Sequence, residues 1–384
     1  MVAKRMGNVP ESGTMKISNL VAKLKTEGVD IISFSVGEPD FNTPDNITQA
    51  AIGALNQHFT HYTPSAGIPE LRKAVAEKSK RENGIPCDPS HVIITPTKHA
   101  VFISFLAMID EGDEVILPDP AWGTFEACAR VAGGTPKFVI MSPDEDYRML
   151  PEKVAEQITR RTKMILINSP SNPLGSVLEE SDVKGIADLA IDHDLTVLAD
   201  ETYEKILFEG RHHSIAALPG MFERTITVNG FSKTYAMTGW RLGWAVAPAP
   251  LTKEINKLQT QSITNATSFV QVAGVEALKG PQTAVRAMVE EFRARRELIY
   301  GLISEIPVLR CPKPKGAFYT FPKYDIDMSS EDLTTLLLKK AHVAVTPGSA
   351  FGPAGEGHIR ISYAADRDSI SEGMRRIKEV LEPF

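Results

Sequence analysis

Short apolar runs rich in branched residues recur between residues 90 and 231, and several are separated by stretches whose apolar residues have helical spacing. The helical pattern is clear at 150–158 and at 181–194. Runs that are apolar on both faces and alternate with helices favour an α/β fold with a mostly parallel sheet covered on both sides. The expected buried strands are 91–96, 114–119, 136–141, 163–169, 196–201 and 225–231.

The pattern changes after residue 280. A long amphipathic helix is predicted at 282–306, followed by shorter, half-exposed strands and a closing helix that ends near residue 384. This predicts three parts: a large domain at 45–280, a smaller α+β domain at 281–384, and an N-terminal segment, 1–44, that packs with the small domain and over the cleft.

Composition and charge exclude several classes of protein. The chain has 384 residues, 42% of them hydrophobic, with a formal net charge of −6, which gives no reason to expect nucleic acid as a partner. It shows neither a signal peptide nor an apolar run of membrane-spanning length, so we expect a cytoplasmic protein without a membrane partner. The three cysteines lack metal-ligand spacing, and His212 and His213 are expected in a solvated loop, so no metal site is predicted.

Polar residues gather where four of the predicted strands end, at 96–100, 168–175, 200–204 and 229–233. Ligands of an open parallel sheet bind at the carboxyl ends of its strands. Each residue also has an ordinary structural explanation, because Asn172 suits a turn, Asp200 suits a helix N-cap and Lys233 can extend to solvent. Their convergence on one edge of the sheet is what indicates a site.

Lys233 and Arg241 are the only charges in the otherwise apolar and small-residue stretch 227–246. Buried cations are costly unless a partner neutralises them, so a ligand is expected to supply that partner. A phosphate suits Arg241, and desolvation would lower the pKa of Lys233 and make it a nucleophile towards an aldehyde. With Asp200 available for a protonated ring nitrogen, these residues match the requirements of pyridoxal phosphate.

Six sequence motifs, which follow one another along nearly the whole chain, point to a known family. The chain resembles the fold-type I pyridoxal-phosphate aminotransferases of classes I and II, and within them the prokaryotic aspartate aminotransferases that lack the animal-type distal arginine. The resemblance implies a large domain with a mostly parallel seven-stranded sheet and a smaller α+β domain. The motifs lie at 35–41, 62–72, 169–175, 200–204, 231–244 and 358–364.

For the cofactor ring, the resemblance implies that Lys233 is the Schiff-base lysine and moves the proton in the transfer. Asp200 would pair with the pyridinium nitrogen, while Asn172 and Tyr203 would hold the ring oxygen. Trp122 would stack on the ring face and, like Asn172, would also contact the substrate.

For the phosphate, the resemblance implies contacts from Arg241, Ser232 and the backbone amides of Thr97 and Lys98. Tyr62 would reach the phosphate from a neighbouring subunit, so a homodimer with shared active sites is expected. The phosphate turn departs from the common pattern: it begins with a proline, which contributes no amide.

For the substrate, the resemblance implies that Gly37 and Arg360 bind the α-carboxylate, Arg360 by a bidentate pair. The shared keto-acid substrate would be 2-oxoglutarate, and aspartate the amino donor. The far carboxylate would meet Lys98, helped by the hydroxyls of Ser12 and Thr14. Alternatively, Lys98 only adds positive charge near the phosphate, and residues 11–14 merely cap the first helix.

Three other functions remain open at this level. The enzyme could prefer alanine or aromatic amino acids, or it could be a C–S lyase or synthase of the same fold that needs no keto acid. A non-catalytic sensor fused to a DNA-binding module is disfavoured because the sequence shows no basic helix-turn-helix extension.

Overall fold

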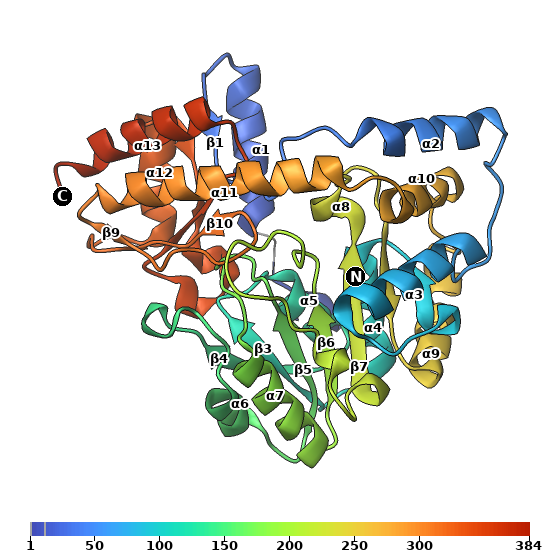
Figure 1. Ribbon diagram of the computed structural model, residues 1–384. Helices are drawn as coiled ribbons and strands as arrows, with labels where there is room; N and C mark the ends of the chain where they lie inside the picture. Colours follow the sequence, from blue (N-terminus) through green and yellow to red (C-terminus); the bar gives the residue numbers. More distant parts are fainter. Residues whose placement is uncertain (1, 11–12) are drawn as a thin grey trace.

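The computed structural model describes residues 2–10 and 13–384, and a seven-stranded sheet forms its centre (Figure 1). The strand order is β2-β8-β7-β6-β5-β3-β4, and β8 is the strand that runs antiparallel to its neighbours. The expected mostly parallel sheet and its six predicted strands are therefore confirmed, with β8 as the strand that was not predicted. The bounds are β2 Val92–Ile94, β3 Glu114–Asp119, β4 Thr135–Ile140, β5 Thr162–Asn168, β6 Thr196–Asp200, β7 Thr225–Gly230 and β8 Gly243–Val246.

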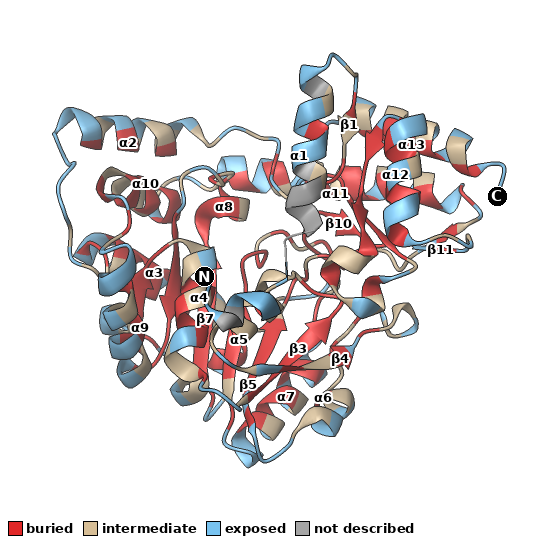
Figure 2. Ribbon diagram, turned by 180° about the vertical axis from the view of Figure 1, so that it is seen from behind, coloured by how far each residue is buried: buried red, intermediate tan, exposed pale blue. Residues whose placement is uncertain are grey.

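Helices cover both faces of this sheet, which explains why its strands are apolar on both sides. On β3, Val115 and Leu117 pack towards α4, α5 and α9, whereas Ile116 packs towards α6 and α7. Figure 2 shows the strands buried and the outward helix faces exposed. The helices are α2 Asp45–Asn56, α3 Pro69–Asn83, α4 Thr97–Met108, α5 Thr124–Val131, α6 Pro151–Gln157, α7 Glu180–Asp192, α8 Phe231–Thr234, α9 Ala249–Ser262 and α10 Ser268–Lys279.

The C-terminal part packs around a second hydrophobic core, and a small antiparallel sheet of order β10-β14-β13 runs through it. In Figure 1 its three long helices gather on one side of the molecule. The elements are α11 Thr283–Ser304, β9 Leu309–Arg310, β10 Tyr319–Thr320, β11 Lys323–Tyr324, α12 Ser330–Lys340, β12 Val343–Ala344, β13 Thr346–Pro347, β14 Ile359–Ser362 and α13 Arg367–Leu381.

The N-terminal segment packs with this C-terminal part, and its Phe34 belongs to the second core. Strand β1 (Ile32–Ser33) pairs in parallel with β12, and Val21 of α1 (Gly13–Thr26) packs with Leu338 of α12. The domain limits near residues 44 and 280 stay predictions. Short 3-10 turns are η1 Lys4–Asn8, η2 Pro89–His91, η3 Pro143–Glu145, η4 Ile215–Ala217, η5 Phe222–Arg224, η6 Gly348–Phe351 and η7 Pro353–Gly355.

Among the described residues, no helix combines the length and the apolar character that crossing a membrane requires.

Candidate active site

The carboxyl ends of β5 and β6 lie side by side and hold the first part of the site. Asn168 and Asp200 end these strands as register partners, and Asn168 Nδ2 donates to the Asp200 carbonyl over 3.1 Å. Asn168 Oδ1 in turn accepts from the Asn172 backbone amide at 3.0 Å. The polar turn after β5 is thus tied to the end of β6, which brings Asn172 into the same region as Asp200.

Asp200 is a buried carboxylate without a cationic partner among the residues that the structure describes. Its side chain is 5% exposed, and its Oδ1 accepts from Thr202 N at 3.1 Å and from Thr202 Oγ1 at 2.6 Å. Burial raises its pKa, and among the described residues it takes part in no ion pair. A buried carboxylate of this kind needs a proton or a cation from a ligand, and a protonated ring nitrogen supplies one.

Lys233 stands in α8, directly after β7. Its Nζ donates to the Gly37 carbonyl over 2.6 Å, which links the N-terminal segment to the end of the sheet. Desolvation lowers the pKa of Lys233 to about 8, and the positive charges of Arg360 and Arg241 act in the same direction. The lowered pKa increases the unprotonated fraction of this amine near neutral pH, as a nucleophile or a base requires.

Arg360 on β14 is a buried guanidinium without an acidic partner in the described part of the chain. It is 3% exposed, its Nη1 donates to Asn172 Oδ1 at 3.0 Å, and its Nη2 donates to the Ser35 carbonyl at 2.6 Å. Nε is buried and lacks a hydrogen-bond partner. Burial lowers its pKa, so the site favours a ligand carboxylate that would neutralise the cation.

A second group of cations lies at the start of α4. Lys98 and Arg241 line a hollow of ≈ 410 Å³ together with Pro96 and Thr124. Pro96 is the N-cap and provides no side-chain hydrogen bond, so the first amides of this 12-residue helix are available to an anion. Burial lowers the pKa of Lys98, and the neighbouring Arg241 lowers it further. Arg241 and the free helix amides suit a phosphate.

Two glycines allow α4 to begin this close to the strands. A Cβ at Gly230 of β7 or at Gly243 of β8 would collide with Thr97 Oγ1, which lies 3.4 Å from the Asn229 carbonyl. Both strands therefore need glycine where the first turn of α4 docks. Ser232 is buried at the second residue of α8.

The remaining predicted residues lie around these two groups. Trp122 is 4.6 Å from Lys98, measured from the ring centroid to Nζ, so the ammonium lies over the ring face. Tyr62 is 88% exposed and lines a surface hollow with Asn265 and Ser268. Ser12 lies outside the described residues, and the side chain of Thr14 is not described. The predicted contacts of both residues therefore stay predictions.

Sequence reasoning missed Tyr319, which contacts three of the candidate residues. It lies on β10, and its hydroxyl is 2.8 Å from the Tyr203 hydroxyl. The Arg360 guanidinium carbon lies 4.7 Å from the centroid of its ring. A Cβ at Gly37 would come within 2.5 Å of its hydroxyl, which is a physical reason for glycine there. The sequence signal was only a tyrosine in an aromatic run.

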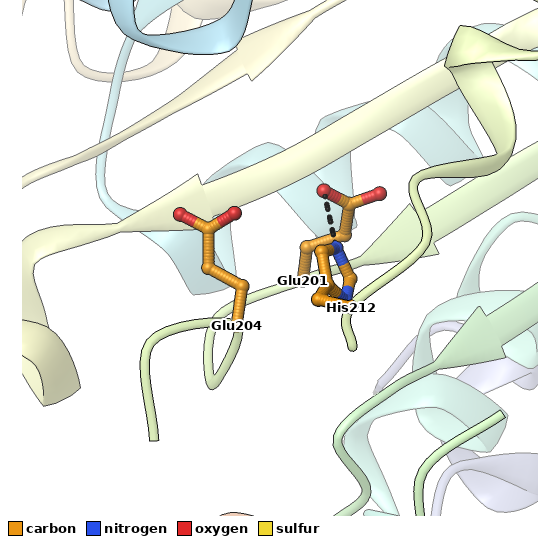
Figure 3. A group of neighbouring side chains, drawn as sticks. All are labelled: Glu201, Glu204 and His212. Carbon is orange, nitrogen blue, oxygen red and sulfur yellow. Dashed lines mark ion pairs between the residues drawn. The ribbon is translucent and has the colours of Figure 1, made fainter. Parts of the chain in front are cut away.

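The expectation that His212 lies in a solvated loop is wrong. Its side chain is 11% exposed, and Nε2 lies 3.1 Å from Glu201 Oε2 (Figure 3). Glu204 pairs with the Lys78 ammonium, and the Asn83 amide donates to both glutamates. The pattern that signals this network is a glutamate directly after each of two site residues, Asp200 and Tyr203.

Glu201, Glu204 and His212 are close enough to hold a cation. However, Lys78 already supplies a positive charge to Glu204, and Asn83 occupies further carboxylate oxygens. Desolvation opposes a charge on His212, but Glu201 and Glu204 together outweigh it and raise the pKa of His212, so the imidazolium neutralises the second carboxylate. The network is thus neutralised by protein groups, and its two glutamates belong to the turn that carries Asp200 and Tyr203.

Comparisons with known proteins agree with this geometry. The family model described as aminotransferase class I and II matches residues 29–377. An aspartate aminotransferase of Pyrococcus abyssi is 42% identical over 99% of this chain and 98% of its own. The structure of Thermus thermophilus aspartate aminotransferase with maleate superposes with a TM-score of 0.95 at 39% identity, over 99% of this chain and 100% of that one.

A Pyrococcus horikoshii aromatic aminotransferase has a TM-score of 0.91 at 42% identity, over 94% of this chain and 99% of that one. Identity at this level over nearly full length establishes both the family and the fold. The chain is therefore an enzyme of the class I and II aminotransferase family, and it has the fold of the aspartate aminotransferases.

Proposed function

We propose that this aminotransferase binds pyridoxal phosphate at Lys233 and moves an amino group from aspartate to 2-oxoglutarate. One observation carries the proposal: two buried charges of opposite sign act on Lys233, and among the described residues Asp200 has no cation and Arg360 no acid as a partner. A protonated cofactor ring would neutralise the charge of Asp200, and a substrate carboxylate would neutralise the charge of Arg360. The family is generally dependent on pyridoxal phosphate, in agreement with this fit.

Different residues would bind different parts of the cofactor. Asp200 would hold the ring nitrogen protonated, and Tyr203 and Asn172 would donate to the ring oxygen. Trp122 would cover one ring face. Arg241, Ser232 and the amides of Thr97 and Lys98 would take the phosphate at the start of α4. When bound, pyridoxal phosphate supplies a protonated ring that withdraws electrons from the substrate's α-carbon and carries the amino group between the two half-reactions.

The protein's own groups perform the remaining work. Arg360 would bind the α-carboxylate through its guanidinium fork, with Ser35 and Asn172 fixing the direction of that fork. Lys233, once released, would take the α-proton and hold it during the transfer, which its lowered pKa of about 8 favours. The same residues then serve the second substrate, a keto acid, in reverse order, so ping-pong kinetics are expected.

Preference for a dicarboxylic substrate depends on Lys98. Its ammonium lies over the ring of Trp122, a residue proposed to contact both the cofactor and the substrate. Pro10 and Ile17, which flank the segment carrying Ser12 and Thr14, line a cavity of ≈ 700 Å³ together with Trp122. The Thermus relative was solved with maleate, which is a dicarboxylate. These observations support a role for Lys98, Ser12 and Thr14 at the far carboxylate.

Replacing Lys98 with Ser should weaken aspartate selectively. Loss of one partner of a buried charge pair costs about 2 kcal/mol or more, so kcat/KM for aspartate should fall roughly 30-fold or further. The values for alanine and phenylalanine should change by less than about threefold, because they lack the second carboxylate. The measurement is kcat/KM for the three donors with 2-oxoglutarate as acceptor.

Lys253→Ser, at an exposed position of α9, is the matched control and should leave all three donors unchanged. Equal losses for the three donors in Lys98→Ser would instead assign Lys98 to the cofactor phosphate alone.

An aromatic donor is the second candidate, because a structural neighbour at 42% identity is an aromatic aminotransferase. A panel of amino donors against 2-oxoglutarate, read by keto-acid formation, distinguishes the two. Aspartate should give the highest kcat/KM. Turnover without any keto acid would indicate a lyase and would overturn the proposal of a transaminase.

We propose a homodimer with shared active sites. Tyr62 is 88% exposed, and the large apolar side chains of Ile52, Leu55, Phe59 and Ile263 are also exposed in the single chain, as expected for residues that a partner copy would cover. Sedimentation should give twice the 42.0 kDa chain mass. Tyr62→Phe should weaken pyridoxal-phosphate binding without dissociating the dimer, whereas a fully active monomer would contradict a shared site.

A further inference from the structure

Tyr319 links the two halves of the proposed site. It is fully buried on β10, in the same small sheet as Arg360 on β14, while Tyr203 follows β6 of the large sheet. The Tyr319 hydroxyl is 2.8 Å from the Tyr203 hydroxyl, and its ring packs against the Arg360 guanidinium at 4.7 Å. A single side chain thus contacts a residue proposed for the cofactor and a residue proposed for the substrate.

The hydroxyl pair contains two protons at neutral pH, because burial raises the pKa of Tyr203 and of Tyr319 above the ordinary value for tyrosine. One proton lies between the two oxygens. Among the described residues, neither hydroxyl has a hydrogen-bond partner other than the hydroxyl of the other tyrosine. If Tyr203 donates to a ligand oxygen, its own oxygen must accept, and Tyr319 is the donor.

We propose that Tyr319 is a positioning residue that donates to Tyr203 and thereby directs the Tyr203 proton at the cofactor's ring oxygen. This inference rests on the proposed function. In a chain of hydrogen bonds each bond polarises the next, so donation from Tyr319 makes Tyr203 a stronger donor. Gly37 is part of the arrangement, because any larger residue there would displace the Tyr319 hydroxyl.

Tyr319→Phe tests this role, since it removes the hydroxyl and keeps the ring over Arg360. Weaker donation leaves more negative charge on the ring oxygen, which holds the proton on the neighbouring Lys233 nitrogen more firmly. The pH midpoint of the absorbance of the lysine–pyridoxal-phosphate adduct should therefore rise by roughly half a unit to one unit, as expected for loss of one hydrogen bond. Absorbance titration of the loaded dimer, without substrate, gives this midpoint.

Tyr147→Phe is the matched control. Tyr147 is also a buried tyrosine, and its hydroxyl donates to the Phe321 carbonyl over 3.1 Å, two residues along from Tyr319. Its removal should leave the midpoint unchanged. An equal shift in both variants would mean a general loss of packing and would overturn the proposal.

A double-variant cycle identifies the route of the effect. Tyr203→Phe should raise the midpoint at least as much, and adding Tyr319→Phe should shift it no further, because Tyr319 acts through Tyr203. If Tyr319→Phe shifted the midpoint further in the Tyr203→Phe background, the Tyr319 hydroxyl would act through a partner other than Tyr203. The same conclusion would follow if Tyr319→Phe changed the substrate KM and left the midpoint unshifted. Absence of any adduct in the wild-type protein would instead refute the proposed function, so the two failures are distinguishable.

Discussion

Replacing Lys233 with Ala should abolish transamination, lowering turnover by roughly 10⁴-fold or more. The variant loses both the nucleophile for the cofactor aldehyde and the base for the α-proton. Among the described residues, Lys233 is the lysine that donates to the Gly37 carbonyl, and the charges of Arg360 and Asp200 both act on it. The measurement is keto-acid formation from aspartate and 2-oxoglutarate at saturating substrate. Only a small change in the free energy of unfolding is expected, because a desolvated amine contributes little to packing.

Lys253→Ala, at an exposed position of α9, is the control and should keep full turnover. The account would be contradicted if Lys233→Ala retained more than about a hundredth of the wild-type turnover, since another group would then be performing the proton transfer.

Arg360→Ala should lower kcat/KM for every amino-acid substrate by roughly 30-fold to several thousand-fold, the range for truncating one partner of a buried charge pair. The reason is that its guanidinium is buried and already oriented by the Ser35 carbonyl and Asn172 Oδ1. Arg360→Lys should recover little, because an ammonium lacks the planar fork that binds a carboxylate with two N–H groups. The cofactor adduct should still form in both variants.

The readouts for this prediction are kcat/KM for aspartate and alanine and the absorbance of the adduct. Arg375→Ala on the exposed face of α13 serves as the control and should be neutral. A variant with unchanged kcat/KM for both donors would remove Arg360 from the carboxylate site.

Much of the sheet was predictable because burial on both faces leaves a strong signal. Val115, Ile116 and Leu117 are consecutive and all buried, since helices cover both sides of β3. Strand β8 was missed because it has only four residues, begins with glycine and lies in a stretch dominated by small and aromatic residues. Its place in the sheet comes from antiparallel pairing with β2 and β7, which no local pattern specifies.

Convergence of the strand-end residues also followed from topology. Parallel strands end at the same edge of the sheet, so Asp200 at the end of β6 and Lys233 just after β7 had to lie near each other. Tyr319 was not predictable in this way, because its contact with Tyr203 spans 116 residues and joins two different sheets. His212 was predicted to lie at the surface because its sequence neighbours are polar, yet it is mostly buried and forms an ion pair with Glu201. Such long-range polar pairs leave no periodic signal in the sequence.

The central claim is that Lys233 is the residue that binds pyridoxal phosphate. Reduction of the protein–cofactor mixture with borohydride, followed by peptide mass spectrometry, tests it most directly. We expect one reduced pyridoxyl adduct, and we expect it on Lys233. A reduced adduct on Lys98 or on any other lysine, with Lys233 unmodified, would contradict the account.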